Sequence, residues 1–325
     1  MTKGPSVSVS AASPPPSSSL PSSSSSSSSP AARSISLPRV LFEAARPRTL
    51  PAGLAPVLYG TAFAVVDGVF HLGACLLAAG GALAIQVGTN YANDYFDAQK
   101  GADTDARVGP RRATQAGLVA PSTMKMAFIV AFAIAVVFGA VLVWRAGWPI
   151  VAIGVASVVC GVLYTGGPRP LGYLGLGDVF VLIFFGPVAV AGTYFVQSLS
   201  FSPLVAVAGL GPGLLSVAIL VVNNLRDRHT DVVAKKKTLA VRWGPTWARA
   251  EYAVAVVAGL LVTVFAPLAR SPLAVCGVVA VPLSFSLIQQ VWTTDGAALN
   301  PLLGRTAKLL LMATIVTSVA MVMGA

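Results

Sequence analysis

Residues 126–144 read MAFIVAFAIAVVFGAVLVW, an apolar run without a charged side chain. A run of this length crosses about 30 Å of hydrocarbon as a helix. Similar runs recur with short polar breaks, and together they predict nine spans: 50–66, 72–88, 124–144, 148–165, 178–197, 202–222, 252–269, 273–292 and 307–324. Their Ala, Gly, Leu and Val content, without alternating polar residues, favours helices over a β-barrel. The sequence therefore predicts an all-α integral membrane protein.

The composition agrees with this fold class. Of 325 residues, 55% are apolar and only 10% are charged, whereas a soluble domain carries about 25% charged residues. The net charge of +11 would suggest a nucleic-acid partner in a soluble protein. In a membrane protein, basic residues gather in cytoplasmic loops instead, so we expect no nucleic-acid binding.

The first 38 residues differ from the rest of the chain. They contain 17 Ser and 7 Pro, and no acidic residue comes before Glu43. This composition cannot bury enough apolar surface to offset its conformational entropy, so a disordered tail is predicted for residues 1–38 and a membrane domain for 39–325. A Ser-rich, acid-poor leader is also typical of an organelle transit peptide, and this alternative stays open.

The basic residues predict the orientation of the bundle. With nine spans, 20 of the 22 Lys and Arg residues lie in the N-terminal region or near the even-numbered loops, and only Arg145 and Arg270 lie on the other face. The positive-inside rule then places the N-terminus and the even-numbered loops on the cytoplasmic or equivalent side.

Six of the eleven acidic residues form two clusters after the second and sixth spans. They are Asp94, Asp97, Asp103, Asp105, Asp227 and Asp231. Acids at the end of a membrane helix are costly unless paired, ligated or solvated, so the clusters mark a candidate functional site, although Asp105 alone is read as surface charge. Both clusters contain Asn-x-x-x-Asp, and Asn90/Asp94 and Asn223/Asp227 are offset by the same 133 residues. This offset indicates a pseudo-repeat whose second and sixth helices face each other across a cavity.

The residue types in these clusters suit a diphosphate and its metal. Carboxylate and amide oxygens are the ligands that Mg²⁺ prefers, and substrate phosphates usually complete its coordination. Basic side chains nearby can hold the remaining phosphate oxygens; they are Lys100, Arg111, Arg112, Arg226, Arg228 and the run Lys235 to Lys237. Since no P-loop or zinc-hydrolase motif is present, nucleotide binding and zinc hydrolysis have no support.

At these residues the chain resembles the UbiA superfamily of intramembrane prenyltransferases, and within it the MenA-type enzymes that act on 1,4-dihydroxy-2-naphthoate. The resemblance extends from Arg46 to the C-terminus. It rests on RPRTLPAGLAPVLYGTA from Arg46, TNYANDYFDAQKGADTDARVGPRRATQAGL from Thr89, YTGGPRPLGYLGLGD from Tyr164 and NNLRDRHTDVVAKKKTLAVRWG from Asn223. It implies nine transmembrane helices around a central cavity, in which Mg²⁺ and a prenyl diphosphate bind at the cytoplasmic end.

The resemblance also implies roles for individual residues. The family motif NDxxDxxxD matches at Asn93, Asp94 and Asp97, but Gly101 takes its last position, and Asp103 is expected to supply the displaced carboxylate. The implied metal ligands are Asp94, Asp97, Asp103, Asn223, Asp227 and Asp231. The implied substrate-binding residues are Asn90, Asn93, Lys100, Arg111, Arg112, Gln115, Arg169, Asn223, Arg226 and Lys237, and Tyr164 is expected to contact the diphosphate or the reacting carbon.

Several alternatives stay open from the sequence. The acceptor could be another aromatic acid such as 4-hydroxybenzoate or homogentisate, and the donor could carry an octaprenyl, nonaprenyl or phytyl chain. Either a bacterial plasma membrane or a plastid membrane suits the fold. A transporter that uses its intramembrane acids is a competing class, but transporters place such acids near the bilayer midplane rather than at span ends.

Overall fold

The computed structural model describes residues 1–2, 4, 36–101, 108–109 and 112–325. The chain divides into two units, Met1–Ser34 and Ile35–Ala325. Most of the predicted tail falls outside the described residues, as do Arg107, Arg111, Asp103 and Asp105.

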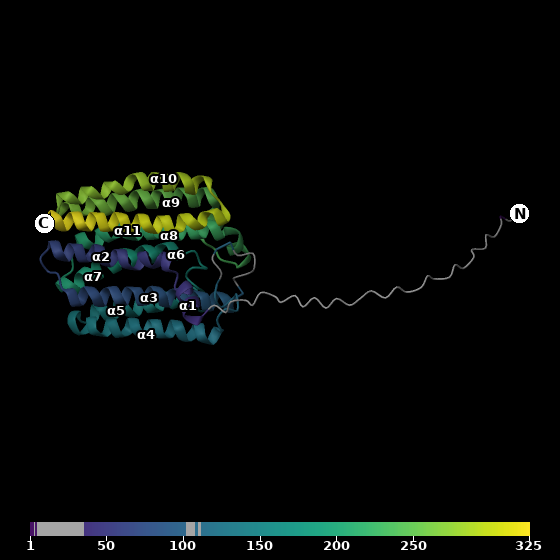
Figure 1. Ribbon diagram of the computed structural model, residues 1–325, viewed down its shortest axis with the longest axis horizontal. Helices are drawn as coiled ribbons and strands as arrows, with labels where there is room; N and C mark the ends of the chain where they lie inside the picture. Colours follow the sequence, from purple (N-terminus) through teal and green to yellow (C-terminus); the bar gives the residue numbers. More distant parts are fainter. Residues whose placement is uncertain (3, 5–35, 102–107, 110–111) are drawn as a thin grey trace, which may run out of the picture. The chain divides into compact units, whose positions relative to one another are not determined.

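The second unit is a bundle of helices that run side by side (Figure 1). Its α-helices are α1 Leu37–Ala44, α2 Leu50–Val66, α3 Leu72–Gln99, α4 Pro121–Ala146, α5 Trp148–Leu163, α6 Gly177–Ile183, α7 Ala189–Ser198, α8 Pro203–Val233, α9 Leu239–Phe265, α10 Val281–Thr293 and α11 Asn300–Met323. Shorter helical segments are η1 Pro47–Thr49, η2 Phe184–Val188, η3 Ala266–Ala269, η4 Pro272–Ala280 and η5 Gly296–Leu299. No strand occurs in the part of the chain that the structure describes.

The nine predicted spans coincide with helical segments of the bundle. Within the described ranges, eight segments are long and apolar enough to cross a membrane, and α5 is a shorter apolar helix. Several helices extend beyond the predicted spans, since α3 continues to Gln99, α8 continues to Val233 and α9 already begins at Leu239. Hydropathy detects only the apolar part of a helix, so the described acids of both clusters, Asp94, Asp97, Asp227 and Asp231, lie on helices rather than in loops.

The fifth predicted span is broken in its middle. Between α6 and α7, η2 contains Pro187 and a non-helical Gly186 with φ −110° and ψ −113°. This break packs closely on α8, where a Cβ added at Gly209 would lie 2.9 Å from the Cα of Pro187. A Cβ added at Gly213 would lie 2.7 Å from the carbonyl oxygen of Leu182. A side chain at Gly209 or Gly213 would clash with the backbone of the broken span, so glycine at these positions lets that span lie directly against α8.

The core is centred on α8, which packs against α9 and α11. Its buried Leu215 and Leu225 belong to one apolar cluster with Tyr252 of α9, Leu287 of α10 and Leu309 of α11. A separate cluster on α3 and α4 contains Phe128 and Phe132. These two apolar clusters pack two groups of helices, one on each side of a central cavity.

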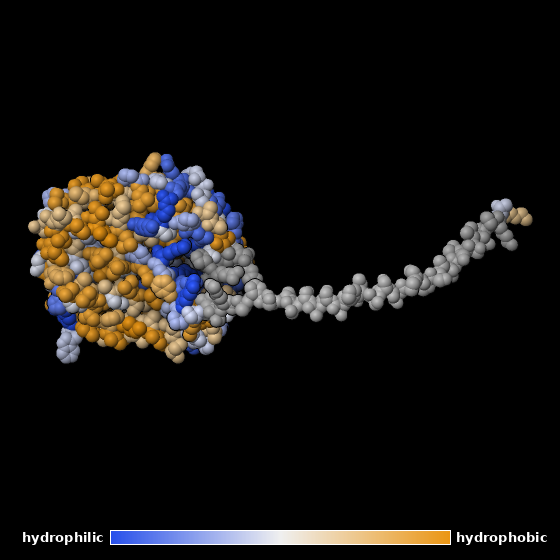
Figure 2. Space-filling view, in the orientation of Figure 1, coloured by the Kyte–Doolittle hydropathy of each residue, from blue (hydrophilic) through white to orange (hydrophobic). Residues whose placement is uncertain are grey.

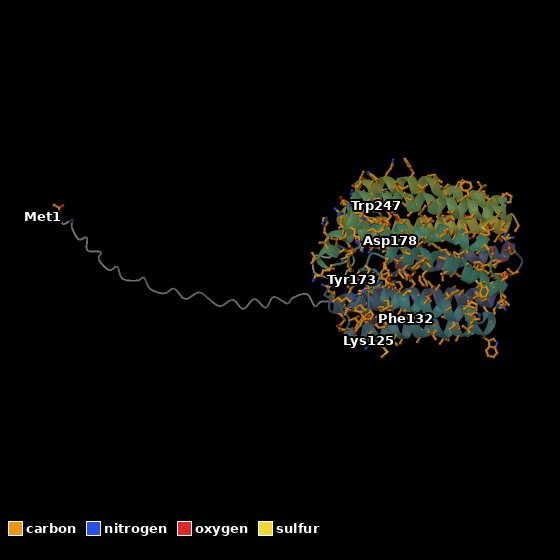
Figure 3. All side chains as sticks on the ribbon, turned by 180° about the vertical axis from the view of Figure 1, so that it is seen from behind. Met1, Lys125, Phe132, Tyr173, Asp178 and Trp247 are labelled. Carbon is orange, nitrogen blue, oxygen red and sulfur yellow. The ribbon has the colours of Figure 1, made fainter. Side chains whose placement is uncertain are left out.

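The bundle has a polar end, where α3 and α8 end and α4, α9 and α11 begin. Hydrophilic side chains gather at this end, whereas apolar side chains cover most of the remaining visible face (Figure 2). Among the described Lys and Arg residues of the second unit, only Arg145 and Arg270 lie at the opposite end, beside the α4–α5 and η3–η4 turns. Tyr173 and Lys125 lie toward the polar end (Figure 3).

Candidate active site at the polar end of the bundle

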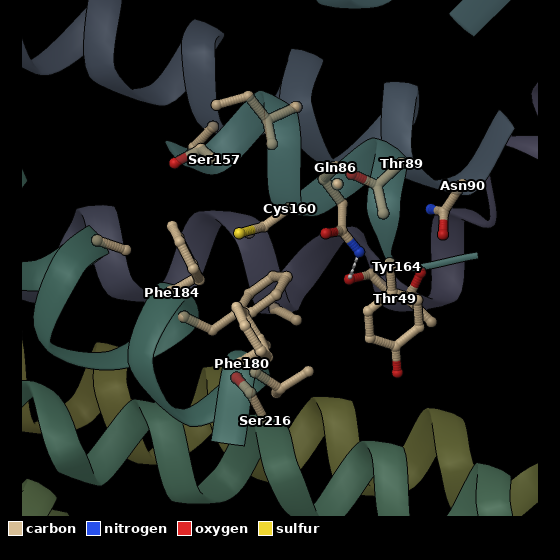
Figure 4. A pocket seen from close by; sticks show the side chains of 18 of the residues that line it. Thr49, Gln86, Thr89, Asn90, Ser157, Cys160, Tyr164, Phe180, Phe184 and Ser216 are labelled. Atoms are coloured by element: carbon tan, nitrogen blue, oxygen red, sulfur yellow. Dashed lines mark hydrogen bonds between the residues drawn. The ribbon is translucent and has the colours of Figure 1, made fainter. Parts of the chain in front are cut away.

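A cavity of about 390 Å³ lies among α2, α3, α5, α6, α7 and α8. Along most of its length the wall is apolar, with residues that include Val57, Ile85, Leu142, Ile150, Ile153, Phe180, Phe184 and Val196. Phe180 and Phe184 stack with ring centroids 6.2 Å apart, and Tyr164, Thr49 and Asn90 lie beyond them (Figure 4). The cavity thus has an apolar body and a polar head, as is usual for a site that binds an amphipathic ligand.

The polar head is built from side chains near the ends of α3 and α8 and from the loops that follow α5 and α8. The polar residues on its wall include Arg46, Asn90, Asn93, Asp97, Arg112, Tyr164, Tyr173, Asn223, Asn224, Asp227, Asp231 and Lys236. Both acidic clusters therefore contribute to one cavity, as the pseudo-repeat predicted.

Asp97 of α3 is fully buried and is held by three other segments of the chain. The Arg112 Nη2 lies 2.7 Å from its Oδ2, and the Lys236 Nζ lies 3.4 Å from the same oxygen. The Tyr173 hydroxyl donates to its Oδ1 at 2.8 Å. A buried carboxylate is tolerated when it is paired and hydrogen-bonded in this way.

Asp227 of α8 takes its main partner from its own helix. The Nε and Nη2 of Arg226 donate to the two carboxylate oxygens of Asp227 at 2.8 and 2.6 Å, and Nη2 also donates to Asn223 Oδ1 at 2.7 Å. One turn further on, Asp231 Oδ1 lies 3.8 Å from the Lys236 Nζ. Lys236 therefore contacts an acid of each helix and links the two clusters directly.

Tyr173 lies between two ammonium groups. The Lys100 Nζ is 4.9 Å and the Lys236 Nζ is 5.0 Å from the centroid of its ring, which is within cation–π range. Lys100 also donates to the carbonyl oxygens of Thr165 and Gly167 at 2.5 and 3.1 Å. Burial lowers the pKa of Lys100, and the charge of Lys236 lowers it further, whereas Asp97 opposes both effects. Cations gathered this closely favour the binding of an anion.

Asp94 is oriented differently from Asp97. Its two carboxylate oxygens accept the backbone N–H groups of Ala113 and Thr114, each at 2.9 Å, and it is not on the cavity wall. The amides of the same helix remain beside the cavity. Asn93 Oδ1 accepts the Thr165 hydroxyl at 2.8 Å, and Asn90 Nδ2 donates to the carbonyl oxygen of Ala45 at 2.9 Å.

The structure brings eight of the fourteen described site residues that the sequence predicted to this cavity. Those on the wall are Asn90, Asn93, Asp97, Arg112, Tyr164, Asn223, Asp227 and Asp231. Those off the wall are Asp94, Lys100, Gln115, Arg169, Arg226 and Lys237, of which Lys100, Arg169 and Lys237 are exposed. Asp103 and Arg111 lie outside the described residues. The binding and catalytic roles of these residues stay predictions.

The predicted site residues did not include four residues of the polar head, Arg46, Tyr173, Asn224 and Lys236, although the run Lys235 to Lys237 was named as a group. Lys236 belongs to a run of three lysines, and only the path of the loop after α8 decides that it, rather than Lys237, faces the cavity. Tyr173 lies in a Gly-rich loop whose position is fixed by a bond from the Lys237 backbone N–H to the Tyr173 carbonyl oxygen, at 2.9 Å. That contact joins segments more than sixty residues apart, so no local pattern could reveal it.

The donor set suits magnesium, although the described residues do not form a compact cluster of three or more His, Cys, Asp or Glu side chains. The cavity wall offers the carboxylates of Asp97, Asp227 and Asp231 and the amide oxygens of Asn93 and Asn223. Hard oxygen donors of this kind are typical of Mg²⁺ sites that substrate phosphates complete. The carboxylates are paired with Arg112, Arg226 and Lys236, so a metal would have to compete with these cations.

Comparison with known proteins adds three findings. The model of the UbiA prenyltransferase family matches residues 53–323. The 1,4-dihydroxy-2-naphthoate octaprenyltransferase of Mycobacterium tuberculosis is 38% identical over 86% of this chain and 96% of its own length. The protein of the same name from Mycobacterium leprae is 40% identical over 81% of this chain and 89% of its own length.

Solved structures resemble the bundle as well. The structure of a UbiA homolog from Archaeoglobus fulgidus bound to DMAPP and Mg²⁺ aligns with a TM-score of 0.60 at 14% identity. The alignment covers 86% of this chain and 99% of that protein. At this level of identity the likeness establishes the fold.

Proposed function

Because this chain belongs to the UbiA prenyltransferase family, we propose that it transfers a prenyl group from a polyprenyl diphosphate to 1,4-dihydroxy-2-naphthoate. Diphosphate and carbon dioxide leave, and a demethylmenaquinol-type product, or its phytyl equivalent, forms for quinone biosynthesis. The mycobacterial relatives named for this acceptor support the choice of substrate, since each covers more than four fifths of the chain. The observation that carries the proposal is one cavity with a cation- and acid-lined head and an apolar body.

The diphosphate of the donor fits the polar head. Arg112 and Lys236 face the cavity there, and both can donate charge-assisted hydrogen bonds to phosphate oxygens. In the structure these two side chains pair with Asp97, so substrate binding would exchange carboxylate partners for phosphate partners. Tyr164, on the wall at the end of α5, would contact the diphosphate or the reacting carbon.

Magnesium is the metal that this donor set fits. We propose Asp97, Asp227 and Asp231 as its carboxylate ligands, with Asn93 and Asn223 as amide ligands. When bound, magnesium supplies Lewis-acid stabilisation of the charge that develops on the leaving diphosphate. Arg226 fixes the Asp227 carboxylate through two hydrogen bonds, and this holds that ligand in place before substrate arrives.

The apolar body fits the isoprenoid chain and the naphthoate ring. Two of its polar side chains are satisfied within their own helices, since the Ser157 hydroxyl donates to the Ile153 carbonyl and the Ser216 hydroxyl donates to the Pro212 carbonyl. Water is therefore poorly held there. A dry cavity protects the electron-deficient allylic carbon of the donor from hydrolysis. The electron-rich ring attacks this carbon instead, and the new bond forms from the ring carbon that carries the carboxylate. The carboxylate then leaves as carbon dioxide.

The protein is an integral, multi-pass membrane protein. We propose that its polar end faces the cytoplasm or the equivalent compartment of a plastid, because the described basic residues of the bundle gather there. The lipid bilayer would then surround the apolar faces of the helices, and the donor would reach the cavity from the membrane.

An assay of the purified protein tests this function. The protein in detergent is incubated with octaprenyl diphosphate and 1,4-dihydroxy-2-naphthoate, with and without Mg²⁺, and prenylated product and carbon dioxide are measured. We expect product and carbon dioxide in equal amounts, only with Mg²⁺. Turnover with 4-hydroxybenzoate or homogentisate alone would contradict the acceptor, and no turnover with any acceptor would contradict prenyl transfer.

A further inference from the structure

Asp94 is a buried acid that the proposed chemistry leaves without a task. It is 3% exposed, and it does not line the cavity of the candidate site. Both of its oxygens are used, because Oδ2 accepts the Ala113 N–H and Oδ1 accepts the Thr114 N–H. A carboxylate that accepts two backbone N–H groups forms strong, charge-assisted hydrogen bonds and holds the backbone that donates them.

The backbone held by Asp94 is the turn that carries Arg112 into the cavity. Arg112 comes directly before Ala113, its side chain is buried, and its Nη2 lies 2.7 Å from Asp97 Oδ2. Ala113 packs in an apolar cluster with Val40 of α1 and Met124 of α4. The position of the Arg112 guanidinium therefore depends on a turn that is fixed at its next two residues.

One turn of α3 holds both the side chain of Arg112 and the backbone that follows it. Asp94 and Asp97 are three residues apart on the same helix, so they lie one above the other. Asp94 accepts a hydrogen bond from the backbone N–H of Ala113, and Asp97 accepts one from the Arg112 guanidinium. This arrangement determines where the guanidinium lies relative to the cavity.

We propose that Asp94 is a positioning residue, which holds the turn after Arg112 so that Arg112 meets Asp97 and the donor diphosphate, and that it is not a metal ligand. The proposal rests on the proposed function, which supplies the diphosphate. It divides the acids of the first cluster into one that faces the substrate, Asp97, and one that fixes the substrate-facing arginine, Asp94.

The Asp94→Asn variant separates this role from metal binding. An amide offers one acceptor oxygen and one NH₂ group, so a buried backbone N–H of Ala113 or Thr114 loses its partner and faces another donor. Leaving such a group unsatisfied in a site that must position a substrate lowers kcat/KM for the donor by roughly tenfold to a hundredfold. If Asp94 acts through Arg112, the midpoint of activation by Mg²⁺ does not rise as it would on loss of a ligand, because a displaced Arg112 competes less with the metal for Asp97.

Hydrogen–deuterium exchange measures the protection of the backbone N–H groups in the turn after Arg112, without any assay of activity. The full-length protein in detergent is compared with Asp94→Asn and with Arg112→Gln over a peptide that spans residues 112–119. We expect faster exchange in Asp94→Asn and nearly wild-type exchange in Arg112→Gln, because only the first variant removes the acceptor of the backbone N–H groups. Unchanged protection in Asp94→Asn would overturn the proposal, whether or not the protein transfers prenyl groups.

Kinetics of the double variant complete the test. We expect Asp94→Asn to add less than about twofold to the loss in an Arg112→Gln background, since residues that act through one contact are not additive. Full additivity, or a Mg²⁺ midpoint raised as far as in Asp227→Asn, would overturn the proposal. If Asp94→Asn cannot be purified, Asp94→Glu keeps the charge but displaces the turn, and the same outcomes apply to it.

Discussion

The ends of α3 and α8 carry the same Asn-x-x-x-Asp spacing but use it differently. On α8, Asn223 and Asp227 both line the cavity. On α3 the aspartate on the wall is Asp97, which follows Asn93 by four residues, whereas Asp94 is turned toward a backbone turn. Helical spacing thus identifies a set of positions, and the segments that pack on the helix decide which of them meets the substrate.

The two ends also differ in where their partners come from. Asp227 is held by Arg226 of its own helix, while Asp97 is held by Arg112, Tyr173 and Lys236 from three separate segments. The Asp227–Arg226 pair therefore lies within α8, whereas these contacts of Asp97 depend on three segments outside α3. We therefore expect substitutions in those three segments to act mainly through Asp97 rather than through Asp227.

The largest effect is expected for Asp97→Asn and Asp227→Asn. Each removes a carboxylate from the cavity wall, and loss of one electrostatic stabiliser of a transition state typically lowers kcat by about 10²- to 10³-fold. Steady-state rates with octaprenyl diphosphate and 1,4-dihydroxy-2-naphthoate measure the loss. As the control, Asp295→Asn at the same end of the bundle should stay near wild type, since Asp295 pairs with Arg228 and Arg249 away from the cavity. Full activity in Asp227→Asn would remove the second cluster from the mechanism.

A smaller loss is expected for Lys236→Ala than for either acid. Lys236 contacts both Asp97 and Asp231, and removing one charge-assisted phosphate contact should raise KM for the donor by roughly tenfold or more. Lys237→Ala is the matched control, because its side chain is exposed and off the wall. Equal KM values for the two variants would show that the lysine run acts only as diffuse charge.

Tyr173→Phe should have a moderate effect on the first cluster. The ring stays between Lys100 and Lys236, but the hydrogen bond from the hydroxyl to Asp97 Oδ1 is lost. A neutral donor to a carboxylate is worth about 1.5–3 kcal/mol, and part of this is recovered by the remaining partners, so we expect a three- to thirtyfold fall in kcat/KM. The hydrogen bond that is lost goes to Asp97, so in an Asp227→Asn background we expect Tyr173→Phe to lower kcat/KM by the same factor as in the wild type.

The smallest effect concerns stability at the end of α8. Partial burial alone would raise the pKa of Asp295, but its hydrogen bond to Arg228 and the charges of Arg228 and Arg249 hold it below its ordinary value. A carboxyl with a lowered pKa stabilises the fold above its unfolded pKa of about 3.9 and stops doing so as pH falls through the folded value. Asp295→Asn should therefore lower Tm slightly at pH 7, and the difference should vanish in acid. A difference that is constant with pH would exclude the ion pairs as its cause.

Much of the fold could be predicted from the sequence, since nine apolar runs and their basic loops follow directly from the chemistry of the bilayer. The two acidic clusters and the polar head could be predicted as well, because hard oxygen donors and cations gather after two spans. Tyr173 could not be found, and no local pattern shows that Asp94 lies off the cavity wall. Their roles depend on the turn after Arg112 and on the loop after Tyr164, whose positions come from contacts between distant segments.

The most direct test compares Asp94→Asn with Asp97→Asn in one Mg²⁺ titration of prenyl transfer, with Asp227→Asn as the reference. We predict that Asp97→Asn resembles Asp227→Asn in both its lost rate and its raised Mg²⁺ requirement, whereas Asp94→Asn loses less rate and does not raise the midpoint. A raised Mg²⁺ midpoint in Asp94→Asn, together with a normal midpoint in Asp97→Asn, would contradict it and make Asp94 the counterpart of Asp227.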